Sequence, residues 1–329
     1  MNLENIIIDI NEDDIPDDIL SILLKDRTTG KNIIWATNVF DRRDSDGKEL
    51  DGYQFFDEIT VPKITKENNQ VIRPRVTKSI TEQLSRSQEK GEVFTPAWVC
   101  NRQNNQIDTI WFGRNDVFNQ EINNGWTTNV EPIEFPEVKG KSWQNYIQEL
   151  KIEICCGEAP YLVSRFDVTT KKPIPVIDRI GLLDRKLRVI NENTPKEKSK
   201  TNHRTWLRWV QKAYASTYGF EWQGDNIVLA REALLLTFIE NYVFKWGNHP
   251  QPSALEKIAN IISWNIWQMD GITFGIPGYE VKEELPDKVL SIQYELEEVN
   301  NNQRLCRVME WSSFEPLEGK KVIFKSLIS

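Results

Sequence analysis

The feature that most constrains this chain is residues 153–161, where an alternating run ends abruptly in small residues. The run itself, residues 146–154, predicts a β-strand, because polar and apolar side chains alternate in it. Gly157 follows at once, and helix-forming residues come after it. A strand that breaks at a glycine before a helix is typical of α/β units that bind nucleotides, since glycine lets a ligand approach the backbone closely.

Two later strands end in a similar way. Residues 218–223 predict a strand with Glu221 near its end, and a long apolar helix begins at residue 224. Residues 265–271 predict another strand, which ends in an aspartate and a glycine. A carboxylate at the end of the second strand of such a fold commonly accepts hydrogen bonds from the two hydroxyls of a ribose. Without the first strand, Glu221 would be better explained as a solvated acid at a strand end.

A helix start precedes the first strand. Thr95 stands before Pro96, and this pair predicts an N-cap followed by proline at the first helical position. The N–H groups of such a helix start are free to bind a carboxylate. An ordinary capped helix is the alternative for this motif taken by itself.

The charge of the chain is unevenly distributed. The net charge of −8 argues against nucleic-acid binding by the chain as a whole. Residues 171–212, however, contain 12 Lys and Arg against 4 Asp and Glu. This segment suits a phosphate backbone, and a solvated surface that pairs with acids elsewhere explains it equally well. The predicted DNA contacts are Arg179, Arg185, Lys186, Arg188, Lys198 and Lys200.

Composition sets further limits. The 4 Cys and 2 His lack the spacing of a metal site, and adjacent cysteines without a basic partner are typical of buried thiols rather than nucleophiles. No apolar run reaches the length of a membrane span, and no signal peptide precedes the chain. We therefore expect a cytoplasmic protein with reduced thiols, no metal and no contact with a membrane.

In their order along the chain, these stretches resemble the gamma-type DNA adenine-N6 methyltransferases of restriction–modification systems. The resemblance is closer still to the proteins labelled restriction endonuclease subunit M. It covers roughly residues 75–275, and the ordered set of motifs carries it rather than any single one. The matching residues are Phe94, Thr95 and Pro96, then Glu153, Cys156 and Gly157, then Gly219 and Glu221 with Ala230 and Arg231 on the following helix, and finally Asn265 and Asp270.

The resemblance implies a site for S-adenosylmethionine. Thr95 would hold the methionine end, and Glu153 would lie near the ammonium group. Glu221 would accept from the ribose hydroxyls and Asp270 from the adenine amine, and Ile266 or Trp222 would cover the ring. The cofactor residues that the resemblance implies are Phe94, Thr95, Pro96, Glu153, Cys156, Gly157, Glu221, Trp222 and Asp270.

The sequence departs from the family at the catalytic motif. The family carries Asp, Asn or Ser before Pro-Pro and an aromatic residue, and this chain contains no Pro-Pro. The polar residue of that motif accepts from the target amine, and the ring stacks on the flipped base. Catalytic residues therefore remain unassigned. One hypothesis is an active enzyme with a divergent or partner-supplied loop. The alternative is a non-catalytic relative that binds DNA or a protein of a restriction, phage or defence system.

These observations predict an α/β protein with a doubly wound, Rossmann-like methyltransferase core over residues 75–275, which includes the basic insertion 171–212. Residues 1–74 are expected to form an N-terminal cover. Residues 276–329 are expected to form a small β-rich extension, with strands over 305–311 and 321–327 joined by a long loop. An unrelated α/β protein with chance matches is a third hypothesis, and the order of the motifs argues against it.

Overall fold

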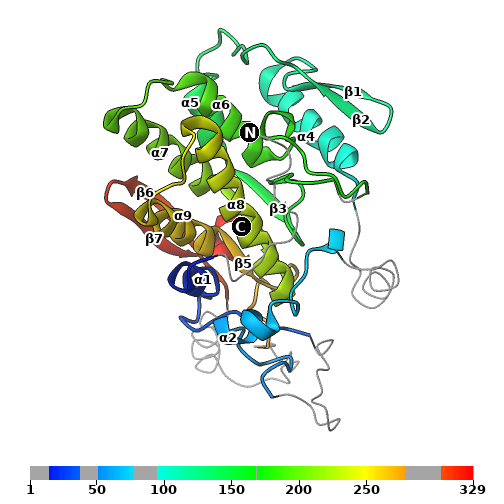
Figure 1. The fold of residues 1–329 in the computed structure, drawn as a ribbon, viewed down its shortest axis with the longest axis vertical. Helices are drawn as coiled ribbons and strands as arrows, with labels where there is room; N and C mark the ends of the chain where they lie inside the picture. Colours follow the sequence, from blue (N-terminus) through cyan, green and yellow to red (C-terminus); the bar gives the residue numbers. More distant parts are fainter. Residues whose placement is uncertain (1–14, 38–50, 78–94, 168, 279–304, 329) are drawn as a thin grey trace, which may run out of the picture.

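The computed structural model describes residues 15–37, 51–77, 95–167, 169–278 and 305–328. Across these residues the chain is a mixed α/β protein with eight α-helices and a central sheet of three parallel strands. The long helix α8 runs through the middle of the molecule (Figure 1). The α/β class expected from the sequence is therefore confirmed.

The central sheet has the strand order β3-β4-β5, and its strands are Lys151–Ile154, Thr217–Glu221 and Ile266–Gln268. In the register of the sheet, Glu153 lies opposite Gly219, which lies opposite Ile266. Because the strands are parallel, their carboxyl ends meet at one edge. The first strand is shorter than expected, since α5 (Trp143–Gln148) takes the beginning of the alternating run.

Each connection between these strands contains two helices. α6 (Leu182–Asn193) and α7 (Lys200–Ala215) connect β3 to β4, and α8 (Gly224–Trp246) and α9 (Pro252–Asn265) connect β4 to β5. α7 begins where the Ser199 hydroxyl accepts a hydrogen bond from the backbone of the third helical residue, as expected of an N-cap. α8 is apolar on nearly all sides, as a helix must be when it is enclosed by others.

The helices and the sheet enclose the larger of two hydrophobic cores. Aromatic side chains from α7 and α8 fill its centre, with the Trp206 and Phe238 rings stacked 6.2 Å apart and the Trp206 and Trp246 rings edge to face. All three side chains are fully buried. Burial of such large rings supplies much of the free energy of folding.

The opposite face of the sheet is covered by a C-terminal hairpin of β6 (Arg307–Phe314) and β7 (Leu317–Ile323), followed by the 3₁₀ helix η6 (Phe324–Leu327). Phe220 and Trp267 of the sheet pack against this hairpin in a second core. The expectation of a hairpin is confirmed, but the prediction of a long loop between its two strands is wrong. Residues 318–319 belong to β7, and the two strands meet in a tight turn.

Asn265 ties the sheet to this hairpin. Its side-chain amide donates to the carbonyls of Tyr214, Ala215 and Thr217, and its oxygen accepts from the Trp311 indole at 2.9 Å. The amide therefore joins the starts of β4 and β5 to β6. This residue matches a family motif, and its contacts in this chain are structural.

The N-terminal segments pack against the same core. They comprise α1 (Asp17–Leu23), α2 (Val61–Ile64) and the 3₁₀ helices η3 (Lys66–Asn68) and η4 (Arg75–Thr77). α1 lies against α9. The Gln268 amide at the end of β5 exchanges two hydrogen bonds with the backbone of Ile34. The segment that carries Ile34 is thereby fixed beside the sheet.

Residues between these segments and β3 form α4 (Ala97–Phe112) and a small hairpin of β1 (Asn119–Ile122) and β2 (Gly125–Thr128). Gly113 ends α4 in a left-handed conformation with φ 72°, which glycine adopts at little cost. A further 3₁₀ turn, η5 (Val176–Asp178), lies against β2.

Arg231 connects the parts of the fold. Its guanidinium is fully buried in α8 and donates to four backbone carbonyls. Burial lowers the pKa of Arg231 to about 9. The charge is therefore costly to bury, and the carbonyl dipoles offset that cost. The acceptors belong to Leu23, Lys25, Ser263 and Ile266.

We predict that Arg231→Met lowers the free energy of unfolding by at least about 2 kcal/mol, because four buried carbonyls lose their donor. Urea denaturation followed by circular dichroism measures this change. Arg204→Met is the matched control, since Arg204 lies on the surface and pairs with Glu315. Equal stability of the Arg231 variant and wild type would contradict the role of this guanidinium.

Candidate functional site

The carboxyl edge of the sheet brings together the strand ends predicted from the sequence. The turn after β3, the end of β4 and the loop after β5 meet there, as ligand-binding segments do in open α/β sheets. The closest link joins Gly157 to Glu221, whose Oε2 accepts from the Gly157 N–H at 2.9 Å. Two motifs that lie 64 residues apart in the chain are therefore in direct contact.

The turn after β3 is strained. Cys155, Gly157 and Ala159 all have positive φ, at 50°, 53° and 62°. Glycine adopts this conformation freely, whereas at Cys155 and Ala159 it costs on the order of 1 kcal/mol each. The turn is held by hydrogen bonds from Cys156 N to the Phe220 carbonyl and from Ala159 N to the Cys156 carbonyl. Ala159 is thus accommodated as a left-handed residue.

Glu221 is half-buried and accepts three backbone hydrogen bonds. Oε1 accepts from the N–H groups of Trp222 and Gln223, at 2.8 and 3.3 Å, and Oε2 accepts from Gly157. A carboxylate has about four acceptor positions, so capacity remains for a donor from a ligand. The same contacts fix the orientation of the carboxylate before a ligand arrives.

Cys155 lies between the two strand-end acids. Its thiol is exposed, and partial burial together with the charges of Glu221 and Asp270 raises its pKa. A methyl group at Gly271 would lie 3.8 Å from its sulfur, so the first and third strand ends are adjacent. Complete burial raises the pKa of Cys156 well above its ordinary value. Neither thiol has the lowered pKa of a nucleophile.

Asp270 closes the loop after β5. Its Oδ1 accepts from the N–H groups of Ile272 and Thr273, at 2.8 and 2.7 Å. Burial alone would raise the pKa of Asp270, but these hydrogen bonds outweigh it and the pKa is lowered. A half-buried, ionised carboxylate therefore lies at this end of the edge.

Thr95 lies beside the first strand but does not cap the helix. α4 begins at Ala97 with Pro96 at the N-cap position, and no side chain caps it, so the predicted capping role is wrong. Thr95 instead forms a side-chain hydrogen bond with Tyr161, which also bonds Cys100. Proline at the N-cap displaces the threonine from the capping position by one residue.

Glu153 is buried on the same side of the sheet. Its Oε1 accepts from the Tyr161 N–H at 3.4 Å, and its charge contributes to the raised pKa of both Cys100 and Cys156. Thr95, Glu153 and Tyr161 thus form one group next to the strained turn. Tyr161 was not among the predicted site residues, although it ends the stretch that defines the motif.

Aromatic side chains border the other end of the edge. Trp222 lies 6.2 Å from Phe55, and Phe55 lies edge to face on Phe56 at 4.8 Å. The Phe56 ring is 70% exposed. Gln268 holds this end by donating to the Trp222 carbonyl at 2.8 Å. The paired phenylalanines were missed as site residues, because their sequence indicates only a packing segment.

The structure thus brings together most of the predicted cofactor residues. Phe94 lies outside the described residues. The residues at or beside the carboxyl edge are Thr95, Glu153, Cys156, Gly157, Glu221, Trp222 and Asp270. Pro96 follows Thr95 as the N-cap of α4.

The predicted basic DNA face of α6 is wrong, because its cationic side chains are buried. The Arg185 guanidinium pairs with Asp108 and also donates to Asn101 and Asn105 of α4. Arg188 donates to Glu192 and to loop carbonyls. Each side chain is at most 7% exposed, so neither reaches a phosphate.

Lys186 and Arg179 are likewise internal. The Lys186 ammonium donates to the Glu149 and Ser216 carbonyls and to two hydroxyls, and burial lowers its pKa well below the ordinary value. Arg179 pairs with Glu240 at 2.5 Å. The prediction of DNA contacts is therefore corrected for these two side chains as well.

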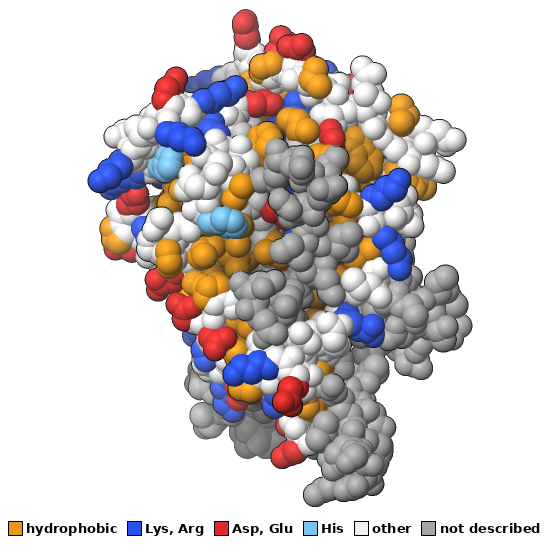
Figure 2. Space-filling view, viewed as in Figure 1, with side chains coloured by type: hydrophobic (Ala, Val, Ile, Leu, Met, Phe, Trp, Pro, Cys, Tyr) orange, Lys and Arg blue, Asp and Glu red, His pale blue; other side chains and the backbone are white. Residues whose placement is uncertain are grey.

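An exposed basic surface does exist, one helix further along the chain. Figure 2 shows Lys and Arg side chains gathered at its left edge, over α7. The exposed cations of this surface are Lys196, Lys198, Lys200, Arg204 and Arg208. Arg204 is neutralised by Glu315 at 2.8 Å. Lys198 and Lys200 therefore remain predicted DNA contacts.

Within the described residues, no group of three or more His, Cys, Asp or Glu side chains is arranged to hold a metal ion. None of the described helices has both the length and the apolarity of a membrane span.

Comparisons with protein-family models, curated proteins and solved structures gave no significant match.

Glu240 of α8 pairs with two buried cations, and these pairs make the free energy of unfolding depend on pH. Arg165 and Arg179 both donate to it. Burial opposes ionisation, but the two guanidinium groups outweigh it and lower the pKa of Glu240. The stabilisation from these two ion pairs is present above the pKa that Glu240 has in the unfolded chain. It is lost as the pH falls toward the lower pKa of Glu240 in the folded protein.

We predict that Glu240→Gln lowers the free energy of unfolding at pH 7 by about 3–5 kcal/mol, because two buried cations lose their counter-charge. The difference from wild type should shrink as the pH falls below 4.5. Denaturant titrations between pH 3 and 7 measure both effects. Glu121→Gln is the control, since the Arg102–Glu121 pair is largely exposed. A difference that does not vary with pH would refute this prediction.

Proposed function

We propose that this chain binds S-adenosylmethionine at the carboxyl edge of its sheet, as a DNA adenine-N6 methyltransferase-like protein of a restriction–modification or phage defence system. The observation that carries the proposal is Glu221. Its carboxylate is pre-oriented at the end of the middle strand, in contact with the Gly157 turn, and retains acceptor capacity. Paired acceptor oxygens at this position match the two hydroxyls of a ribose.

The other groups at this edge fit the remaining parts of that molecule. Asp270 is ionised and can accept from an exocyclic amine, and Trp222 with Phe55 offers an apolar surface for the adenine ring. Glu153 supplies a buried negative charge for the ammonium group, beside Thr95. When bound, S-adenosylmethionine would supply an electrophilic methyl group. This chain would position it and exclude water from it.

The finer fold assignment belongs to the same proposal. We infer that the three parallel strands are one half of a doubly wound, Rossmann-like sheet, with β3 as the strand next to the centre. DNA would then lie along the start of α7 and the segment before it, where Lys200 and Lys198 are exposed. Exposed lysines of this kind contact phosphates without selecting a base sequence.

A non-catalytic relative is the second candidate, and two observations favour it. The sequence contains no Pro-Pro, so the family's acceptor motif for the target amine is missing. Among the described residues, no strand follows β3 on its outer side, where a catalytic segment would be expected in a doubly wound sheet. Such a protein would bind the cofactor, DNA or a partner protein without transferring a methyl group.

We predict that isothermal titration of the purified protein with S-adenosylmethionine detects one site. Glu221→Gln should weaken that binding at least tenfold, about 1.4 kcal/mol, because its amide would face the N–H donors that hold the carboxylate. Glu310→Gln, on the exposed hairpin, is the matched control.

The absence of binding at millimolar ligand, in a protein shown to be folded, would refute the cofactor site. If binding is present, methyl transfer from labelled S-adenosylmethionine to adenine-containing DNA distinguishes the enzyme from the non-catalytic relative. The two candidates make opposite predictions in this second assay.

For DNA, we predict that the double variant Lys198→Glu and Lys200→Glu weakens binding to duplexes of any sequence. The slope of log affinity against log salt should fall by about one for each phosphate that is no longer neutralised. Fluorescence anisotropy at several salt concentrations measures both quantities. The double variant Lys320→Glu and Lys325→Glu, at two exposed positions of the C-terminal region, controls for the same change in net charge. An unchanged slope in the double variant would exclude α7 as the DNA surface.

A further inference from the structure

The face of the sheet that the hairpin covers stays open over β3. On this strand Leu150, Ile152 and Ile154 form a row of apolar side chains that are 71%, 44% and 68% exposed. The register places Ile152 opposite Tyr218 of β4, whose hydroxyl donates to the Met309 carbonyl of the hairpin. Parallel sheets are normally buried on both faces. The hairpin therefore covers β4 and leaves the row on β3 accessible to a ligand.

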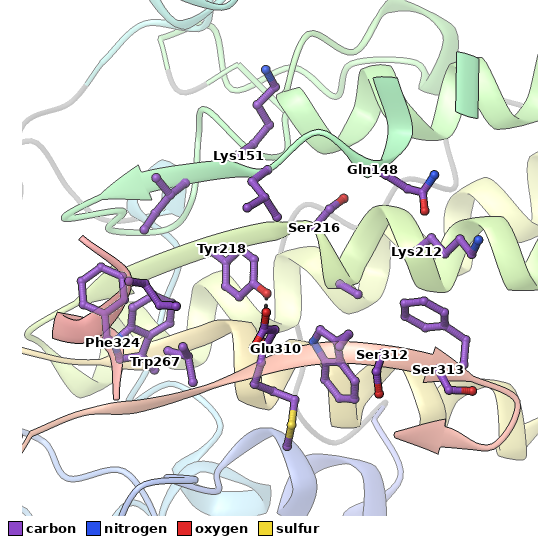
Figure 3. Close-up of a pocket in the computed structure, with 18 of the residues that line it drawn as sticks. Gln148, Lys151, Lys212, Ser216, Tyr218, Trp267, Glu310, Ser312, Ser313 and Phe324 are labelled. Carbon is purple, nitrogen blue, oxygen red and sulfur yellow. Dashed lines mark hydrogen bonds between the residues drawn. The ribbon is translucent and has the colours of Figure 1, made fainter. Parts of the chain in front are cut away.

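A groove of about 810 Å³ lies between this row and the hairpin. Figure 3 shows β3 and β4 on one side of it and β6 on the other. It follows β6 from Val308 to Phe314, which is a length of roughly 20 Å at the rise of a β-strand. The volume is typical of small-molecule sites, and the length suits a long, narrow ligand. None of the predicted cofactor residues lines this groove, so it is a different site from the carboxyl edge.

The two ends of the groove differ in polarity. Figure 3 shows Phe324 and Trp267 at one end, and Lys212, Ser312 and Ser313 at the other. A lysine ammonium only donates hydrogen bonds, and serine hydroxyls can donate them as well. The polar end therefore suits a group that accepts hydrogen bonds, and the aromatic end suits an apolar group.

Two cations at the polar end have no carboxylate in contact. Arg208 and Lys212 of α7 line the groove one helical turn apart. Among the residues that the structure describes, neither side chain forms an ion pair or donates a hydrogen bond, and the Lys212 ammonium lies over the Trp209 ring at 4.5 Å. Burial, and after it the charge of Arg208, lower the pKa of Lys212. Like charges four residues apart on a helix repel each other, so a bound anion would stabilise both.

The nearest acid at this end is already shared by several cations. Glu315 pairs with Arg204 at 2.8 Å. This pair lowers the pKa of Glu315, and the charges of Lys257 and Arg208 contribute to the same shift. Because one carboxylate serves three cations, the polar end of the groove keeps an excess of positive charge.

We propose that this groove binds a free fatty-acid carboxylate, which is a long apolar chain with a single anionic head. The head lies between Arg208 and Lys212, and the chain runs between β3 and β6 over Ile152. Glu310 of β6 lines the groove beside Tyr218, as Figure 3 shows, and its charge would repel a second anionic group on the ligand. The arrangement of charges therefore selects a monoanion and gives it one orientation.

Calorimetric titration of the full chain with decanoate, below its micelle concentration, tests the charged end. Decanol, which has the same chain without the charge, should bind at least about tenfold more weakly. Lys212→Met should weaken decanoate binding at least about tenfold and leave decanol binding unchanged, because methionine keeps an apolar stem and removes the charge. Lys320→Met, at an exposed position of β7, is the matched control.

The apolar row is tested with a second variant. Ile152→Asp should weaken the binding of both decanoate and decanol at least about tenfold, because it places a charge beside the chain. Ile110→Asp is the matched control, since Ile110 on α4 is 84% exposed. A far-UV circular dichroism spectrum equal to that of the wild type shows that each variant is folded.

The absence of decanoate binding at millimolar concentration, in folded wild-type protein, would overturn the proposal. Equal affinities for decanoate and decanol would do the same, as would binding that neither Lys212→Met nor Ile152→Asp weakens. Binding to vesicles of anionic phospholipid without binding of free decanoate would assign the surface to a membrane instead. These titrations contain neither S-adenosylmethionine nor DNA, so they and the tests of the proposed function can fail independently.

Discussion

A single buried cation determines how the parts of this protein meet. The Arg231 guanidinium lies in α8, where water is excluded, and its donors are satisfied only by backbone carbonyls. Those carbonyls come from the end of α1, from α9 and from β5. A buried cation without hydrogen-bond acceptors costs far more free energy than an unpaired cation on the surface. These segments are therefore held where their carbonyls reach the guanidinium. The position of β5, and with it the shape of the carboxyl edge, follows from this arrangement.

The carboxyl edge is ordered before any ligand binds. The Gly157 turn is strained at two non-glycine residues, and the Glu221 carboxylate holds it from the neighbouring strand. Strain of this kind persists only where surrounding contacts overdetermine the backbone. A ligand that bonds Glu221 would therefore find both the acid and the turn already in place. Pre-orientation reduces the ordering cost of binding, which favours this edge as the candidate site.

Sequence analysis predicted the strand ends correctly but did not predict that the basic side chains of α6 are buried. The difference lies in how far apart in the sequence the interacting residues are. Alternation and a glycine break are local, so the ends of β3 and β4 could be recognised from a few residues. The charge of Arg185 is local as well, but its partner Asp108 lies 77 residues away. A basic helix face that is solvated and one that is paired internally have the same sequence pattern. For the same reason, Phe55 could not be placed beside Trp222 from sequence.

The covering hairpin has a consequence for the order in which the protein can fold. β6 and β7 follow the sheet in the chain, yet they provide the cover for Phe220 and Trp267. During synthesis the sheet is complete before its cover has left the ribosome, so a broad aromatic surface is exposed for that interval. Such surfaces are bound by chaperones or drive aggregation. The cover over Phe220 and Trp267 can therefore form only after β7 has emerged.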